Sequence, residues 1–198
     1  MGAQAAQVTH VDIAFAVEGG PLPRDHSFDL WRALSEAAPA LFADPAVALL
    51  PVRGASAGAG GIVLQRRSRL LMRLPEAAVE LALGLCGVRL EVAGARMTLG
   101  DAKTRPLAPY ATLYAHRVAA EHDDEASFVK QAAAELGRID VAADFIVGKR
   151  SLTRGAAGDI AGFSLMLAEL SARQSLALQV HGLGAHRGLG FGVFVGHK

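Results

Sequence analysis

The chain is poor in cysteine. Its 198 residues include only one, Cys86, which lies inside the apolar stretch LALGLCGV. A single cysteine excludes a disulfide within the chain and also a zinc site built from several thiolates. We expect the Cys86 side chain to be buried as a small apolar residue, and the composition suits a reducing cytoplasm.

An excess of charge is missing too. The chain has 20 lysine and arginine residues against 19 aspartate and glutamate residues, so its formal net charge is +1. Global charge therefore gives no sign of a nucleic-acid binder, and any basic surface must come from local clustering. Aromatic residues make up 6% of the chain, which gives little support to an RNA-binding surface based on base stacking.

Long hydrophobic runs are also lacking. No apolar run in the sequence approaches the roughly 18 residues that a membrane helix needs. Residues 1–17, MGAQAAQVTHVDIAFAV, have no basic segment ahead of the apolar part and contain Asp12. This pattern is typical of a strand and not of a signal peptide. We predict a cytoplasmic protein with no membrane partner.

The hydrophobic content of 52% supplies a core for one large domain or two small ones. In the first half, a β-rich stretch over 8–17 precedes a turn and a helix that Asp25 can cap. Pro39 should end or kink this helix near Ala38. Its apolar face would consist of Leu30, Trp31, Leu34, Ala38 and Leu41.

The remaining elements give both halves one order, β-α-β-β-α-β. Strands are predicted over 47–53, 60–65, 69–74, 88–94, 95–100, 111–119, 141–150, 160–170 and 191–196. Helices are predicted over 75–87, 123–137 and 171–180, the last capped by Ser171. The fold class is therefore α+β, with two tandem ferredoxin-like domains over 1–104 and 111–198. We interpret DAKTRPLAPY, over 101–110, as the linker between them.

A glycine-rich segment, HGLGAHRGLGFGVFVGHK, ends the sequence. A dinucleotide-binding turn would need the order strand, glycines, helix, with an acidic residue about 20 positions further on. Here a helix precedes the glycines, and six residues follow Gly192. Two interpretations stay open. The glycines allow close backbone packing, or their N–H groups cradle a phosphate with help from Arg187.

These glycines carry a resemblance to a known family. The pattern Gly182-Leu183-Gly184, five residues, then Gly190-Phe191-Gly192 resembles the C-terminal signature of the CRISPR-associated repeat-RNA-processing endoribonucleases. In that family the signature ends the second of two ferredoxin-like domains. The segment GGPLPRDHSFDLWRAL is also similar to the family, which tends to carry its catalytic histidine near the first helix.

His26 is the candidate for that histidine, because it lies at the start of the first predicted helix. A helix N-terminus lowers the pKa of an imidazole, and an RNA phosphate raises it again. The resemblance implies attack by a ribose 2′-OH, giving 2′,3′-cyclic phosphate and 5′-OH ends without a metal or cofactor. His26 would be base, acid or both; otherwise it is a surface or capping histidine. The assisting residue stays open among Tyr110, Tyr114, Ser27, Lys149 and Arg150.

Basic residues gather in two clusters. Arg66, Arg67, Arg69 and Arg73 fall within QRRSRLLMR, and Lys149, Arg150 and Arg154 fall within GKRSLTR. The odd-numbered arginines of the first cluster would share one strand face, where they contact RNA phosphates or protect a strand edge. The second cluster forms a predicted hairpin that, by resemblance, engages the base of a stem-loop.

Repeat RNA, as a stem-loop with flanking single strand, is therefore the expected partner, and other effector-complex subunits are a further option. Arg24, His186 and Arg187 complete the predicted RNA-binding residues, together with Gly182, Gly184, Gly190 and Gly192. No histidine pair has metal-ligand spacing, so no metal site is predicted. The alternatives are a subunit that binds repeat RNA without cleaving it, and a ferredoxin-like protein for a small molecule.

Overall fold

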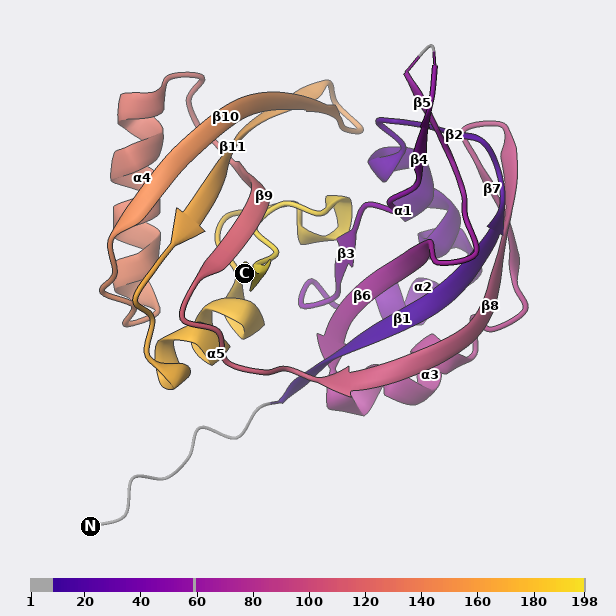
Figure 1. Ribbon diagram of the computed structural model, residues 1–198, viewed down its shortest axis with the longest axis horizontal. Coiled ribbons are helices and arrows are strands. Elements are labelled where there is room, and N and C mark those ends of the chain that lie inside the picture. Colours follow the sequence, from indigo (N-terminus) through magenta and orange to yellow (C-terminus); the bar gives the residue numbers. More distant parts are fainter. Residues whose placement is uncertain (1–8, 59, 198) are drawn as a thin grey trace.

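A computed structural model describes residues 9–58 and 60–197 of the chain, and Figure 1 shows them as two antiparallel sheets with their helices. The first sheet has the strand order β3-β6-β1-β8-β7. Its strands are β1 (His10–Gly19), β3 (Ala48–Leu50), β6 (Arg69–Pro75), β7 (Arg89–Val92) and β8 (Ala95–Pro106). Val8, where the predicted first strand began, lies outside the described residues.

The first half builds its core from the alternation along β1. Val11, Ile13, Phe15 and Val17 are buried on one face of the sheet, and helices cover that face (Figure 1). These helices are α1 (Ser27–Ala37), α2 (Pro39–Phe42), a 3₁₀ turn η1 (Glu76–Ala78) and α3 (Val79–Leu83). The break between α1 and α2 falls at Ala38, as Pro39 predicted.

A small third sheet lies over the loop that leads into α1. It has the order β2-β5-β4, formed by β2 (Leu22–Pro23), β4 (Ala55–Ala57) and β5 (Gly61–Val63). The Arg24 N–H donates to the Gly60 carbonyl at 2.9 Å. The hairpin between β4 and β5 is therefore attached to the chain directly before His26.

The second half has a four-stranded sheet with the order β10-β11-β9-β12. Its strands are β9 (Leu113–Ala119), β10 (Phe145–Arg154), β11 (Asp159–Leu167) and β12 (Val195–Gly196). Its helices are α4 (Glu125–Arg138) and α5 (Ala172–His181), followed by a 3₁₀ turn η2 (Arg187–Leu189). Ser171 caps α5 in a capping box with Gln174, so the predicted cap is confirmed.

Both large sheets have the strand order of the ferredoxin-like fold. Numbered along each half, the strands lie in the order 2-3-1-4, with β7 added outside β8 in the first half. The predicted fold class, α+β with two tandem ferredoxin-like units, is confirmed by solved structures of the same fold. The domain limits at residues 104 and 111 stay a prediction.

Several local predictions are wrong. The helix predicted over 75–87 is a 3₁₀ turn and the short α3, which ends at Leu83, and the strand predicted over 191–196 is β12, which is confined to Val195–Gly196. Residues 101–106 of the predicted linker belong to β8, which pairs with β1 as far as Val11↔Pro106. Their exposure hid the strand, because nearly every side chain there faces solvent and no alternation appears in the sequence. Cys86 is exposed instead of buried, since α3 ends at Leu83 and the apolar stretch that contains Cys86 continues as a turn.

The C-terminal segment after α5 joins the two halves. In Figure 1 it runs between the two large sheets, and η2 contacts β3 and α1. Val193 packs with Ala48 and Leu50 of β3, while Phe191 packs with Phe28 and Trp31 of α1. Two apolar contacts of this kind hold the halves together, one at β3 and one at α1.

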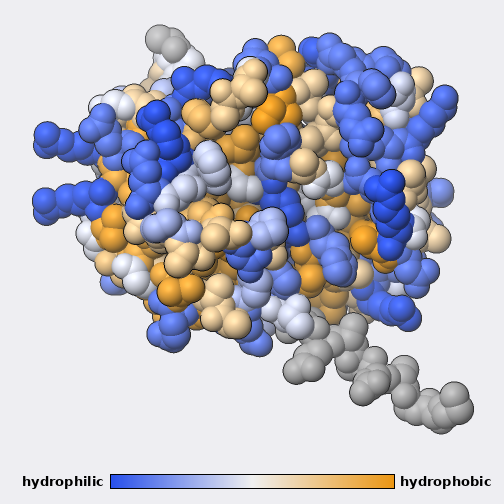
Figure 2. Space-filling model, turned by 180° about the vertical axis from the view of Figure 1, so that it is seen from behind, coloured by the Kyte–Doolittle hydropathy of each residue, from blue (hydrophilic) through white to orange (hydrophobic). Residues whose placement is uncertain are grey.

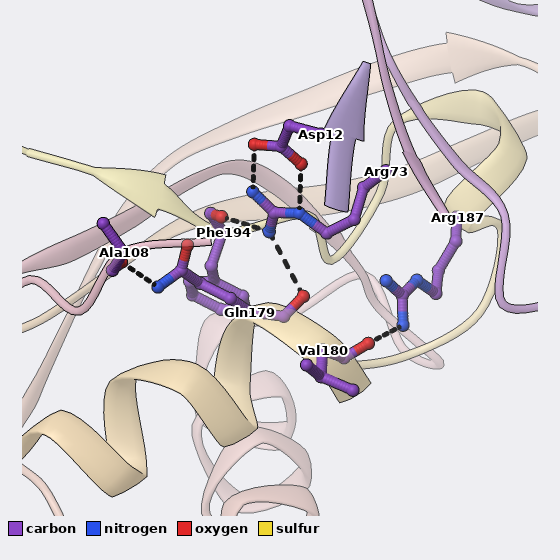
Figure 3. Close-up of polar contacts among 7 residues, drawn as sticks. All are labelled: Asp12, Arg73, Ala108, Gln179, Val180, Arg187 and Phe194. Carbon is purple, nitrogen blue, oxygen red and sulfur yellow. Dashed lines mark hydrogen bonds and ion pairs between the residues drawn. The ribbon is translucent and has the colours of Figure 1, made fainter. Parts of the chain in front are cut away.

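Arg73 adds hydrogen bonds between the two halves, as Figure 3 shows. Its guanidinium is 1% exposed and pairs with both carboxylate oxygens of Asp12 at 2.7 and 3.0 Å. It also donates to the carbonyls of Gln179 at 3.1 Å and Phe194 at 2.7 Å, in the second half. The prediction that Arg73 shares an RNA-facing surface is therefore wrong. Its four hydrogen bonds all go to protein acceptors, and RNA has no access to it.

The outer surface carries no continuous apolar band on the side that Figure 2 displays, where hydrophobic patches alternate with hydrophilic residues. Within residues 9–58 and 60–197, no helix is long and apolar enough to cross a membrane.

The first prediction concerns the hydrogen bonds of Arg73. Arg73→Ala leaves the Asp12 carboxylate and two inter-half carbonyls without their donor, so we expect the free energy of unfolding to fall by about 3–5 kcal/mol. Urea denaturation followed by circular dichroism measures the loss. Arg173→Ala is the matched control, because Arg173 forms an exposed ion pair with Asp140 and should change stability by less than about 1 kcal/mol. Equal stability of both variants would contradict the role of Arg73.

Candidate functional site

His26 occupies the N-cap position of α1. The preceding segment, PLPRD, contains β2 and pairs with β5 of the β4–β5 hairpin, so the chain that leads into the helix is held in place. The His26 carbonyl accepts the first helical hydrogen bond, from the Leu30 N–H at 2.9 Å. Asp25, the expected cap, lies one residue earlier and its carboxylate contacts another element, described below.

Both ring nitrogens of His26 are engaged by the backbone. Nδ1 lies 2.8 Å from the Pro23 carbonyl, which only an N–H can satisfy, and Nε2 accepts the Val52 N–H at 3.1 Å. The ring is therefore neutral, with its proton on Nδ1 and its lone pair on Nε2. The side chain is 1% exposed, and burial lowers the pKa of His26 below 6.5.

Arg154, at the end of β10, docks onto the same helix start. Its backbone N–H donates to the Asp25 carboxylate at 2.9 Å, and its guanidinium pairs with Asp29. The guanidinium also lies over the Phe28 ring, 5.7 Å from the centroid. In Figure 1 the tip of the β10–β11 hairpin accordingly reaches across to α1. Residues on both sides of His26 thus hold a hairpin of the second half.

Arg117 of β9 approaches His26 from the other side. It donates to the Ser27 hydroxyl at 2.7 Å and to the Thr153 hydroxyl, and its guanidinium lies 5.1 Å from the Phe191 ring centroid. Burial lowers the pKa of Arg117, and its Nε has no hydrogen-bond partner within the described part of the chain. Its charge also lowers the pKa of His26, after the larger effect of burial.

These contacts define the α1 cluster, which consists of His26, Ser27, Asp29, Arg117 and Arg154. It combines a neutral imidazole, a hydroxyl, two guanidinium groups and a carboxylate, that of Asp29, which pairs with Arg154, at the junction of the two halves. Such a set of groups suits a phosphodiester, because imidazole can move a proton and guanidinium can stabilise charge on phosphate oxygens.

Sequence reasoning placed His26 and Arg154 but missed Arg117 and Asp29. A weak signal was present for both. Arg117 is a charged residue inside the apolar strand ATLYAHRVA, and Asp25 and Asp29 flank His26 with a spacing of four residues. Neither signal shows which residue of the other half the side chain meets.

The other candidates for an assisting residue lie elsewhere. Arg150 is exposed and pairs with both oxygens of Asp123 at 2.6 Å, and Lys149 is exposed beside it on β10. Tyr114 contacts His116 and His197. Tyr110 is exposed and packs against Gly196. Of the five candidates, only Ser27 belongs to the α1 cluster.

Arg66, Arg67 and Arg69 are gathered on the surface, but they do not share a strand face as predicted, because Arg66 and Arg67 lie in the turn before β6. These arginines line an open hollow between β5 and β6 together with Gln65. Arg69 donates to the Arg66 carbonyl at 2.8 Å, which fixes the turn. All three side chains are exposed, and so is Arg24 before His26. They can reach a phosphate without rearrangement of the fold.

The glycine segment is paired within the protein. The N–H groups of Gly182, Gly190 and Gly192 donate to the carbonyls of Leu178, Arg187 and Arg117 at 2.9, 2.9 and 2.8 Å. The Gly184 N–H donates to the Glu135 carboxylate. Of the two interpretations, these contacts favour close packing over a phosphate cradle, because all four amides already have protein acceptors.

Close packing explains the glycines instead. Gly182 and Gly192 have φ values of 64°, and a Cβ on either would lie 2.4 or 1.8 Å from a backbone oxygen of the other strand of the loop. Arg187 caps the end of α5 by donating to the Val180 carbonyl at 2.7 Å, as Figure 3 shows. It also donates to the His181 carbonyl. Burial lowers the pKa of Arg187 to about 10. Arg187 therefore serves the fold, whereas His186 is exposed.

The fold and the α1 cluster define the chain as a protein of two ferredoxin-like units with a cationic, histidine-containing junction. A model of the Cas6 CRISPR family matches residues 11–198. The CRISPR-associated endonuclease Cas6 of Myxococcus xanthus (strain DK1622) is 37% identical over 186 residues, which cover 93% of this chain and 80% of that protein. The chain belongs to the Cas6 family, so the resemblance inferred from the glycine signature is confirmed.

Two solved structures show the same fold. One is a CRISPR associated protein Cas6, with a TM-score of 0.66 at 12% identity, covering 96% of this chain and all of that one. The other is Cse3 of Thermus thermophilus bound to an RNA representing a pre-cleavage complex. Its TM-score is 0.53 at 14% identity, covering 94% of this chain and 98% of that one.

The second prediction follows from the buried imidazole of His26. Its pKa is lowered in the folded state from 6.5, so below about pH 6.5 the unfolded chain binds more protons. Stability should therefore fall as pH is lowered from 7 to 5. We expect His26→Gln to lose less stability than the wild type over that range, as measured by urea denaturation at each pH. Parallel losses in both proteins would show that His26 does not contribute.

Proposed function

We propose that this chain is an endoribonuclease that cleaves CRISPR repeat RNA. Membership of the Cas6 family supports the proposal, as does the relative of 37% identity that is named an endonuclease. A structural neighbour is named as an endoribonuclease bound to RNA. The observation that carries the proposal is the α1 cluster, because it brings a neutral histidine and two guanidinium groups to one place at the junction of the halves.

His26 is suited to act as the base. Its proton is held on Nδ1 by the Pro23 carbonyl, so Nε2 presents a lone pair in the tautomer that accepts a proton. The ribose 2′-OH beside the scissile phosphate would donate to Nε2, lose its proton there and attack phosphorus in line. The bond from phosphorus to the 5′ oxygen breaks, and the leaving oxygen takes a proton from the imidazolium that His26 has become or from solvent. The products are a 2′,3′-cyclic phosphate and a 5′-OH, and the reaction needs no metal because the nucleophile belongs to the RNA.

The Val52 N–H now occupies the place that this 2′-OH would take. Cleavage therefore requires the segment around Val52 to withdraw from His26. The residues after Val52 lead into the β4–β5 hairpin, where Ser56 and Val63 are exposed and Ile62 is buried. The hydrogen bond from the Arg24 N–H to the Gly60 carbonyl joins Arg24 to this hairpin. RNA that contacts both would therefore be placed to displace the Val52 N–H from His26.

Arg117 and Arg154 would stabilise the negative charge that develops on the phosphate. Arg117 already has an unpaired buried Nε in the described structure, and buried donors aimed at developing charge contribute more than exposed ones. The Ser27 hydroxyl, which accepts from Arg117, lies directly after His26 in the chain. We assign Ser27 to holding Arg117 in place.

The exposed cations then provide the path for the RNA. Arg66, Arg67 and Arg69 bind phosphates of one segment, and Lys149 and Arg150 bind the base of the stem, with Arg24 and His186 beside the α1 cluster. Retention of the product, association with other effector subunits and a cytoplasmic location are parts of the same proposal.

One observation favours a second candidate function. His26 is 1% exposed and both of its nitrogens are bonded, which is what a purely structural histidine would show. On that alternative the chain binds repeat RNA within an effector complex and does not cut it.

The third prediction separates the two. With repeat RNA from the source genome and excess EDTA, the wild type should cut and leave a cyclic phosphate end. His26→Ala should lower the cleavage rate by at least about 100-fold, since a general base contributes 10²–10⁴-fold, while RNA affinity changes little. Denaturing gels give the rate, and a shift assay gives the affinity.

His122→Ala is the matched control, because His122 is exposed in the loop before α4 and should leave the rate unchanged. Cleavage by His26→Ala at the wild-type rate would remove His26 from the mechanism. Tight binding without cutting by the wild type would favour the non-cleaving subunit.

The fourth prediction concerns the surface arginines. The double variant Arg66→Ala/Arg67→Ala should reduce the slope of log affinity against log salt concentration by about 1 for each phosphate that is no longer neutralised. Fluorescence anisotropy with labelled repeat RNA at several salt concentrations gives the slope. Arg89→Ala removes an exposed arginine of β7 and should leave the slope unchanged. If the double variant keeps the wild-type slope, these arginines do not bind RNA.

A further inference from the structure

An apolar cavity of about 460 Å³ opens beside the α1 cluster. Phe28 and Trp31 of α1 form one wall, the tip of the β10–β11 hairpin over 155–160 forms a second, and η2 with His186 forms a third. Walls from both halves of the molecule therefore meet here. Neither the glycine signature nor the proposed proton transfer uses this space.

Small residues keep the cavity open. The hairpin tip has the sequence GAAG over 155–158, with a hydrogen bond from the Gly155 N–H to the Gly158 carbonyl at 2.9 Å. At Gly188 an added Cβ would lie 2.7 Å from Cδ1 of Trp31. A larger side chain at the tip would fill the hollow, and one at Gly188 would displace the Trp31 ring.

The walls have the chemistry of a site for a flat aromatic group. The rings of Phe28 and Trp31 lie 6.0 Å apart between centroids, at 32° to each other, and both are half-buried. The Arg154 guanidinium lies over the Phe28 ring. Two polar side chains, Asp159 and His186, belong to the lining. An apolar pocket with a few polar groups is the usual form of a specific ligand site, and aromatic rings beside a cation are the usual platform for a nucleobase.

The position of the cavity indicates which group enters it. Trp31 follows His26 by five residues, so the two lie about 7.5 Å apart along the helix axis. A nucleotide close to the scissile phosphate can therefore place its base in the cavity while the phosphate lies at the α1 cluster. Arg154 contacts both places, because its guanidinium pairs with Asp29 of the α1 cluster and lies over the Phe28 ring of the cavity wall. Its charge matches that of the connecting backbone.

We propose that this cavity binds one unpaired nucleobase of the RNA, next to the cut, by stacking it on Trp31 and Phe28. The proposal rests on the proposed function and adds to it a determinant of sequence and position. Stacking accepts any base, and Asp159 and His186 supply the polar groups that distinguish one base edge from another.

The test uses Trp31, the single tryptophan of the chain. Its ring lines this cavity and also a second hollow with Phe42 and Val47, so the Ala157→Leu variant described below, at a residue that lines only the first, assigns the change in emission. Repeat RNA from the source genome is compared with a set of RNAs in which one unpaired nucleotide at a time lacks its base. We expect intact RNA to quench Trp31 emission. One abasic position beside the cut should restore the emission and weaken affinity about 5- to 150-fold, which corresponds to one stacked base.

A variant of the hairpin tip tests the same point without disturbing α1. Ala157→Leu projects a larger side chain from an exposed tip residue that lines the cavity. It should weaken binding of intact RNA by a similar factor and leave binding of the critical abasic RNA unchanged. Ala133→Leu, at an exposed position of α4, is the matched control and should bind both RNAs as the wild type does.

The outcomes separate this proposal from the one on which it rests. If RNA is bound and cut but no abasic position changes the emission or the affinity, the cavity takes no base and the endoribonuclease proposal stands. Equal weakening of intact and abasic RNA by Ala157→Leu would also overturn the base site. If the wild type binds no repeat RNA, both proposals fail.

Discussion

The burial of Arg73 is the constraint on which the arrangement of the two halves depends. A guanidinium taken out of water is unfavourable unless its N–H groups are paired. Asp12 supplies the compensating charge from the neighbouring strand, but the carbonyls of Gln179 and Phe194 come from the other half. The first half therefore satisfies its own buried charge fully only when the second half is docked. That requirement makes the relative position of the halves specific, where apolar contacts alone would tolerate sliding.

The glycine segment has to meet that geometry. Between α5 and β12 the chain turns back on itself and passes between β3 and β9. A Cβ added at Gly190 would lie 3.1 Å from the Leu49 carbonyl oxygen. A side chain there would crowd Leu49 and Pro51 and would be strained at the φ of 86° that Gly190 adopts. The same segment positions Phe191 under Arg117. The glycines thus influence the α1 cluster through packing, although none of their four paired amides is free to meet a phosphate.

Much of the fold was readable from the sequence because local patterns determined it. The alternation of Val11, Ile13 and Phe15, the cap at Ser171 and the break at Pro39 are each set by residues close together in the chain. The strand over 101–106 was not predicted, because an exposed strand on a sheet shows no alternation. The burial of Cys86 and Arg73 was mispredicted for a different reason. Their environments are set by where α3 stops and by what the second half places against β6, and neither is encoded next to those residues.

The candidate site divides in the same way. His26 was found because a helix start and a family pattern mark it locally, whereas Arg117 comes from 91 positions further along the chain and is recognisable only after the halves dock. The hydrogen bond from Val52 to His26 is likewise a long-range contact.

The Val52 N–H protects the neutral imidazole of His26 from water until another group donates to Nε2. On the proposed mechanism, phosphate contacts made away from the cut supply the binding energy that removes the Val52 N–H. Proton transfer then becomes possible only when RNA is correctly seated. Binding energy used in this way favours the correct RNA in the step that follows binding, so the enzyme would discriminate in cleavage more than in affinity.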